Sequence, residues 1–147
     1  MTTYVALLRA INVSGRNKIP MADLQALFTG LGHDDVNTYL QSGNVVFHTK
    51  RATTRDLASA IEARIARDLG LEVPVLVRTR RELETLLADN PFVGPRVDPK
   101  TLHAVFTIEP LPRSSMAGIA KRHPSIGPVR FTSSTRCHVS RSIVTTS

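Results

Sequence analysis

Residues 36–48, VNTYLQSGNVVFH, decide the fold of this 147-residue chain. Two short runs rich in β-branched and aromatic residues, Val36–Leu40 and Val45–His48, flank the polar segment Gln41–Asn44. The Gly-Asn pair in that segment tolerates the positive φ angles that tight turns require, so the stretch predicts a β-hairpin. The elements on either side of this hairpin determine the fold to which it belongs.

A strand, a loop and a helix are predicted on the N-terminal side of the hairpin. Thr3–Leu8 is a short run of β-forming apolar residues and predicts a strand. Arg9–Ile19 is rich in Asn, Ser and Gly without a hydrophobic period, which indicates a loop, and Pro20 suits the first position of a helix. One apolar helix face follows at Leu24, Leu27, Phe28 and Leu31, and Gly30 and Gly32 mark its end.

A helix, a strand and a second helix are predicted on the C-terminal side. The helix begins near Thr53 or Thr54, where a threonine cap precedes an aspartate, and Gly70 ends it. Its apolar residues recur every four positions, at Leu57, Ile61, Ile65 and Leu69. Val73–Arg78 predicts a strand, and Thr79–Glu82 is a capping box that opens the next helix. The apolar residues of that helix are Leu83, Leu86 and Leu87.

The order strand, helix, strand, strand, helix, strand over residues 1–90 predicts an α+β protein with a ferredoxin-like first half. After the Asn90-Pro91-Phe92 break the pattern restarts, with a strand at Leu102–Ile108 and a short helix around 116–120. Two further short strands are predicted, at Val129–Phe131 and, within the tail, at Cys137–Val139. We therefore expect a second, incomplete ferredoxin-like half over 91–131, and a frayed Ser/Thr/Arg-rich tail over 132–147.

Composition indicates a cytoplasmic globular protein. Hydrophobic residues make up 41% and charged residues 21% of the chain, and no apolar run approaches the ~20 residues of a membrane span. The N-terminus lacks the basic and apolar regions of a secretory signal, and the single cysteine, Cys137, suits a reducing compartment. No membrane partner is expected.

The net charge of +7 lies almost entirely near the C-terminus. Residues 1–109 hold 13 basic against 12 acidic residues, whereas residues 110–147 hold six basic residues and no acidic one. Nucleic-acid binding is therefore expected to be weak and unspecific. The aromatic residues that could stack on RNA bases are Tyr4 and Phe47, but the latter and Tyr39 are expected in the core.

The residues of metal sites and nucleophilic catalysis are not gathered in any recognisable pattern. The five histidines show no i, i+4 spacing, and Cys137 is the only thiol, so no metal is expected. His138 follows Cys137 directly, and adjacent residues of a strand point to opposite faces, so this pair is not expected to form a nucleophile and its base. No cofactor is predicted.

The predicted topology indicates a ligand-binding site at one end of the sheet. In a ferredoxin-like unit the first two strands run the same way, so the loop after the first and the turn after the second emerge at one end of the sheet. This brings together seven polar residues: Arg9, Asn12, Asn17, Lys18, Gln41, Ser42 and Asn44. The basic residues stand just before a helix N-terminus, which attracts anions. Equally open is a purely structural role, in which these side chains cap each other's backbone.

None of the seven residues is a His, Asp, Glu or Cys, so a general base is not evident and binding is favoured over catalysis. The predicted function is that of a module that binds a small ligand or anion. One alternative is an enzyme that acts on a phosphorylated or nucleotide-like small molecule, and a second is a weak nucleic-acid binder. Whether the chain is an enzyme, and its oligomeric state, stay open.

Two segments carry a resemblance to a known family. YVALLRAINVSGRNKIPMADLQALFTGLG (residues 4–32) and VNTYLQSGNVVF (residues 36–47) resemble the LLRGINVGG-NK and TY-(I/L/V)-QSGNV segments of the bacterial family called domain of unknown function 1697. The resemblance is dense over residues 4–47 and looser through Phe106. It implies two ferredoxin-like halves and no particular reaction.

The chain departs from that family at three places. Ala10 and Ser14 stand where the family usually has glycine, and both residues are small enough to keep the loop's shape. Family members close with a further helix and strand around a Thr-Arg-Asn-Trp-Asn-Thr segment, which this chain lacks. This departure predicts a truncated or frameshifted C-terminus.

Overall fold

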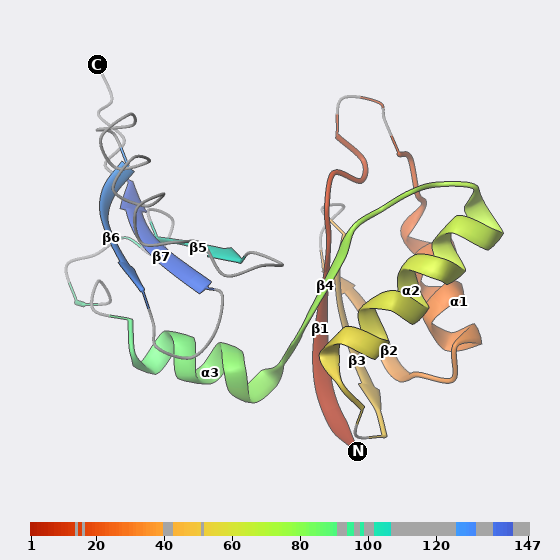
Figure 1. Ribbon diagram of the computed structural model, residues 1–147, viewed down its shortest axis with the longest axis horizontal. Helices are drawn as coiled ribbons and strands as arrows, with labels where there is room; N and C mark the ends of the chain where they lie inside the picture. The colour runs from red at the N-terminus through yellow and green to blue at the C-terminus, as the bar shows by residue number, and fades with distance from the viewer. Residues whose placement is uncertain are drawn as a thin grey trace. The chain divides into compact units, whose positions relative to one another are not determined.

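A four-stranded antiparallel sheet organises the first part of the chain in the computed structural model (Figure 1). Its strands are β1 (Thr2–Leu8), β2 (Asp34–Tyr39), β3 (Asn44–Thr49) and β4 (Val75–Thr79). The order across the sheet is β2-β3-β1-β4, and every pair of neighbours is antiparallel. Strands β1 and β2 therefore run in the same direction with β3 between them, as the predicted topology requires.

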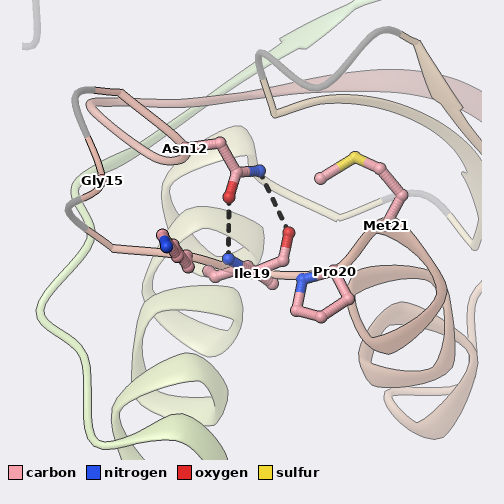
Figure 2. Close-up of a pocket in the computed structure, with 6 residues that line it drawn as sticks. Asn12, Gly15, Ile19, Pro20 and Met21 are labelled. Carbon is pink, nitrogen blue, oxygen red and sulfur yellow. Dashed lines mark hydrogen bonds between the residues drawn. The ribbon is translucent and has the colours of Figure 1, made fainter.

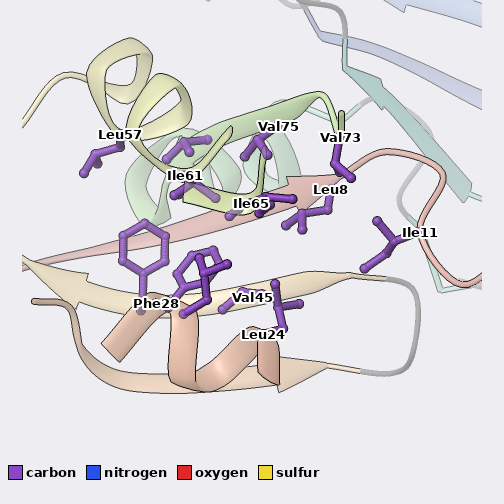
Figure 3. Close-up of a cluster of buried hydrophobic side chains, with 14 of the residues drawn as sticks. Leu8, Ile11, Leu24, Phe28, Val45, Leu57, Ile61, Ile65, Val73 and Val75 are labelled. Atoms are coloured by element: carbon purple, nitrogen blue, oxygen red, sulfur yellow. The ribbon is translucent and has the colours of Figure 1, made fainter. Parts of the chain in front are cut away.

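Two helices join these strands and lie on one side of the sheet, α1 (Met21–Gly30) between β1 and β2 and α2 (Thr54–Leu69) between β3 and β4 (Figure 1). The βαββαβ order confirms the α+β, ferredoxin-like fold. Side chains from both helices meet alternate residues of the strands in one cluster (Figure 3). Its fully buried large members include Tyr4, Phe28, Phe47, Leu24, Ile61, Ile65, Val45 and Val77.

Local chemistry explains the ends of the helices. The Thr53 hydroxyl accepts the N–H of Asp56 at 3.1 Å and caps α2, and Gly70 ends it with a left-handed φ of 64°. Helix α1 begins one residue later than predicted, because Pro20 is its N-cap residue and Met21 its first helical residue. The predicted apolar stripes of both helices face the cluster.

Two residues predicted for apolar contacts are instead exposed. Tyr39, expected in the core, is 65% exposed, because it ends the edge strand β2 on the face that alternation turns away from Val36 and Thr38. Leu87, expected to line its helix, is also 65% exposed. Tyr4 and Phe47 are buried, so neither presents a ring to a nucleic-acid base.

The second part of the chain contains a three-stranded antiparallel sheet. Its strands are β5 (Leu102–Phe106), β6 (Ile126–Phe131) and β7 (Cys137–Ser142), in the order β5-β7-β6. This order repeats the order β1-β3-β2 of the first sheet. Strand β7 occupies the centre of the sheet and contains the predicted strand Cys137–Val139. It continues to Ser142, so residues 137–142 of the expected frayed tail pair with β5 and β6.

The helix α3 (Arg80–Ala88) follows β4 and begins at the predicted capping box. The Glu82 carboxylate accepts the N–H of Thr79 at 2.7 Å, and the Thr79 hydroxyl accepts the N–H of Glu82 at 3.2 Å.

The chain divides into the units Met1–Leu83 and Glu84–Ser147, a boundary earlier than the one expected after residue 90. The structure describes residues 1–13, 15, 17–39, 43–50, 52–90, 94–95, 98, 102–106, 126–131 and 137–142. The Pro91-Phe92 break, the helix predicted near 116–120 and the remainder of the tail lie outside these residues. Within these ranges, no helix has the length and apolarity to cross a membrane.

Candidate functional site

The loop after β1 and the turn before β3 meet at one end of the first sheet. The backbone N–H of Leu8 donates to the carbonyl of Gly43 at 3.1 Å. Gly43 has a φ of 81°, and a Cβ atom there would lie 2.5 Å from the Cδ1 atom of Ile11. Only glycine fits this close approach, and it confirms that the two predicted segments emerge together.

Side-chain amides hold the loop in shape. Asn12 bonds the backbone of Ile19 twice, donating from Nδ2 to its carbonyl at 3.0 Å and accepting its N–H on Oδ1 at 2.9 Å (Figure 2). Asn17 donates from Nδ2 to the carbonyl of Ala10 at 3.3 Å, and the N–H of Asn12 donates to the carbonyl of Asn17 at 3.1 Å. These bonds give both asparagines the structural role that the sequence left open.

The backbone of the loop is wound unusually tightly. Ala10, Asn12 and Asn17 have φ angles of 57°, 54° and 47°, and Gly15 has 77°. Asparagine and glycine adopt this left-handed region readily, whereas alanine pays about 1 kcal/mol or more for it. The Asn12–Ile19 and Asn17–Ala10 bonds therefore maintain a conformation that Ala10 by itself resists.

A pocket of about 440 Å³ opens between this loop and the start of α1. We call it the loop pocket, and its described lining residues are Asn12, Gly15, Lys18, Ile19, Pro20 and Met21 (Figure 2). Lys18 is exposed and brings an ammonium group, while Ile19, Pro20 and Met21 bring apolar surface. The volume lies within the range of sites for small molecules.

The first turn of α1 places backbone N–H groups beside the loop pocket that have no partner among the described residues. The first bond within the helix runs from the N–H of Leu24 to the carbonyl of Pro20 at 3.1 Å, so the N–H groups of Met21, Ala22 and Asp23 precede the ladder. Among the described residues, no side chain caps this end. The Asp23 carboxylate in the first turn offsets part of the positive field of the helix terminus.

The predicted residues fall into five groups. Lys18 and Asn12 line the loop pocket, and Asn17 holds the loop. Arg9 is exposed, its backbone N–H donates to the carbonyl of Pro74 at 3.0 Å, and it is not among the described lining residues. Asn44 belongs to the sheet face opposite the helices, because Val45 next to it is in the core. Gln41 and Ser42 lie outside the described residues.

Sequence reasoning missed the apolar wall of the loop pocket. Ile19, Pro20 and Met21 stand at the junction of loop and helix, whereas the sequence pattern points only to the polar residues around them. The sequence could have indicated these residues, because side chains next to a helix start lie beside any ligand that binds the N–H groups of its first turn. The position of Asn44 could also have been found, from the alternation of Val45 and Phe47.

A second pocket competes with the loop pocket as a candidate site. It has a volume of about 460 Å³ and lies between α2 and the segment that leads into β4. Its described lining residues are Glu62, Ala63, Ala66, Glu72, Val73 and Pro74. One carboxylate, that of Glu62, already accepts the N–H of Val75 at 2.7 Å. Two carboxylates repel anions, so this pocket does not suit the predicted ligand.

Known proteins resemble the chain in family and fold. A family model described as "Protein of unknown function (DUF1697)" matches residues 1–135. The structure of the conserved bacterial protein SP0830 from Streptococcus pneumoniae is similar with a TM-score of 0.71 and 24% sequence identity, over 97% of this chain and 78% of that one. No curated protein matches the chain. At this identity the structural likeness shows a shared fold.

Proposed function

The chain belongs to the protein family of unknown function DUF1697, and we propose that it binds a small anionic ligand in the loop pocket. The observation that carries the proposal is the position of Lys18, which lines the same pocket as the uncapped start of α1. An ammonium group and free backbone N–H groups are the two kinds of donor that proteins commonly combine for anions.

The rest of the lining supports a ligand with an apolar body as well as a charge. Ile19, which is 2% exposed, lines the loop pocket from the core side, and Pro20 and Met21 extend this apolar surface toward α1. A thioether adapts to ligands of different shapes. The described lining thus offers an ammonium and apolar groups to a ligand, while the Asn12 amide holds the backbone of Ile19 in place.

Calorimetric titration of the full chain with inorganic phosphate and with adenosine monophosphate tests the proposal. We expect Lys18→Gln to weaken the tighter of the two about tenfold or more, since a charge-assisted contact contributes roughly 1.5–3 kcal/mol. Lys50→Gln is the matched control, because Lys50 is also exposed and lies at the far end of β3.

Equal affinities of the Lys18 and Lys50 variants, or no binding of either probe at millimolar concentration, would contradict the proposal. Release of inorganic phosphate from the nucleotide during the titration would instead favour the alternative of an enzyme on a phosphorylated substrate. Loss of that release in Lys18→Gln would place the reaction in the loop pocket.

A further inference from the structure

A histidine is buried among aromatic rings at one end of the first unit's core. His33 is 8% exposed, and its ring centroid lies 4.6 Å from that of Phe47 and 6.0 Å from that of Phe28. Tyr4 stacks on Phe47 at 5.8 Å. We call these four residues the aromatic corner. Neither Nδ1 nor Nε2 of His33 has a hydrogen-bond partner among the described residues.

The aromatic corner fixes the connection between α1 and β2. The N–H of His33 donates to the carbonyl of Phe28 at 3.3 Å, directly after the end of α1. The Gln25 side chain adds a hydrogen bond from α1 to β2, donating to the carbonyl of Val36 at 3.1 Å, and Leu31 and Val36 pack against the core. The packing of the imidazole therefore anchors residues 31–36 to the core.

Only the neutral imidazole suits this position. Protonation gives the ring a positive charge and two N–H donors, and a buried charge without hydrogen bonds is costly. Burial lowers the pKa of the His33 imidazole, and the neighbouring Asp34 carboxylate opposes this effect without overcoming it. A cation over the face of Phe47 would recover part of the cost, but not the lost hydrogen bonds to water.

The charge of Asp34 favours the His33 cation, but not enough to outweigh burial. Further charged or titratable groups lie on the elements around the aromatic corner. They include Tyr4 on β1, Asp23 on α1, Asp35 on β2, His48 on β3 and Arg64 on α2. Asp35 lies 3.5 Å from Nδ1 of His48, and Arg64 donates to the carbonyl of Gly30 at 3.2 Å. Asp23 lies in the first turn of α1, at the opposite end from the aromatic corner.

We propose that His33 is a proton-sensitive anchor, whose neutral ring holds the α1–β2 connection in the aromatic corner and whose protonation releases it. The sign of the effect follows from linkage. The unfolded or released chain takes up a proton near the ordinary histidine pKa of about 6.5, whereas the anchored ring resists it. The free energy that favours the anchored state is therefore fully present above that pH and decreases as the pH falls below it.

Amide hydrogen exchange of the full chain at several pH values between 7.5 and 5.0, corrected for intrinsic exchange, tests this proposal. We expect protection of residues 29–36 to fall by up to tenfold per pH unit below about 6.5, as one linked proton requires. His33→Phe keeps an aromatic ring without a titrating group and should abolish this dependence. His48→Gln, on the opposite face of β3, is the matched control and should retain it.

The same pH dependence in His33→Phe and in the original chain would overturn the proposal. If His33→Phe fails to fold, the imidazole resonances of the original chain decide the question by NMR titration. We expect the His33 ring to titrate below its ordinary pKa, with the exchange of residues 29–36 following its midpoint. A His33 ring that titrates at or above about 6.5 would contradict the proposal.

Discussion

Ala10 occupies a backbone conformation that suits glycine better. Its φ of 57° is left-handed, and the residue is exposed, so no packing of its methyl group compensates for the strain. We expect Ala10→Gly to stabilise the protein by about 0.5–1 kcal/mol, the relief of strain exceeding the added entropy of the unfolded chain. Urea unfolding midpoints at constant m-value measure the change.

The control for this substitution is Ala26→Gly, at an exposed position of helix α1. Glycine in a helix interior should cost about 1 kcal/mol. Equal destabilisation by both substitutions would contradict the predicted backbone strain at Ala10. The resemblance to a family that usually has glycine at this position predicts the same direction.

Single residues show where sequence reasoning stopped. The segment Arg9–Lys18 was identifiable as a functional candidate, but whether Asn12 and Asn17 bind a ligand or hold the loop depends on angles and distances within the folded loop. The hydrogen bonds of Asn12 to Ile19 decide this in the structure. Lys18 was identifiable because its place before a helix start is a property of the sequence alone.

Helices and strands of the first unit were largely predictable, because their apolar periods, caps and turn residues agree with one another. The Thr53 cap, the Gly70 end and the box at Thr79 and Glu82 all occur where expected. Strand β7 was predicted only over Cys137–Val139, and its continuation to Ser142 was missed because residues 140–142 are polar. The position of such a strand is specified by backbone pairing with its neighbours rather than by a hydrophobic period.

The central place of β7 predicts the effect of a C-terminal truncation. Both β5 and β6 pair with β7, so deletion of residues 136–147 should remove the partner that they share. We expect the amides of residues 102–106 to lose hydrogen-exchange protection, since Leu102 to Phe106 pair with Arg141 to Cys137. A shorter truncation after Ser142 leaves β7 intact and serves as the control. Unchanged protection in the longer truncation would show that this pairing does not stabilise β5.

The distribution of charge over the chain predicts the strength and specificity with which it binds nucleic acid. Residues 1–109 carry a net charge of +1 and residues 110–147 one of +6, from 13 minus 12 and six minus zero charged residues. Because Tyr4 and Phe47 are buried, the first sheet offers neither ring for base stacking. We expect weak binding that ignores sequence and falls steeply with salt.

Fluorescence anisotropy with two unrelated 20-nucleotide DNA strands, at 50 and 200 mM salt, checks this expectation. The affinities for the two strands should agree, and both should drop by at least tenfold at the higher salt concentration. Arg136→Gln combined with Arg141→Gln should weaken binding to both strands equally. A preference for one strand that survives 200 mM salt would indicate specific recognition instead.

The most direct test of ligand binding in the loop pocket is a map of amide chemical shifts during titration with inorganic phosphate. The largest changes should fall on Lys18, Met21 and Ala22, at the junction of the loop and α1. They should vanish in Lys18→Gln and persist in Lys50→Gln. Changes spread over the basic residues of the chain, or unaltered by Lys18→Gln, would contradict a phosphate site in the loop pocket.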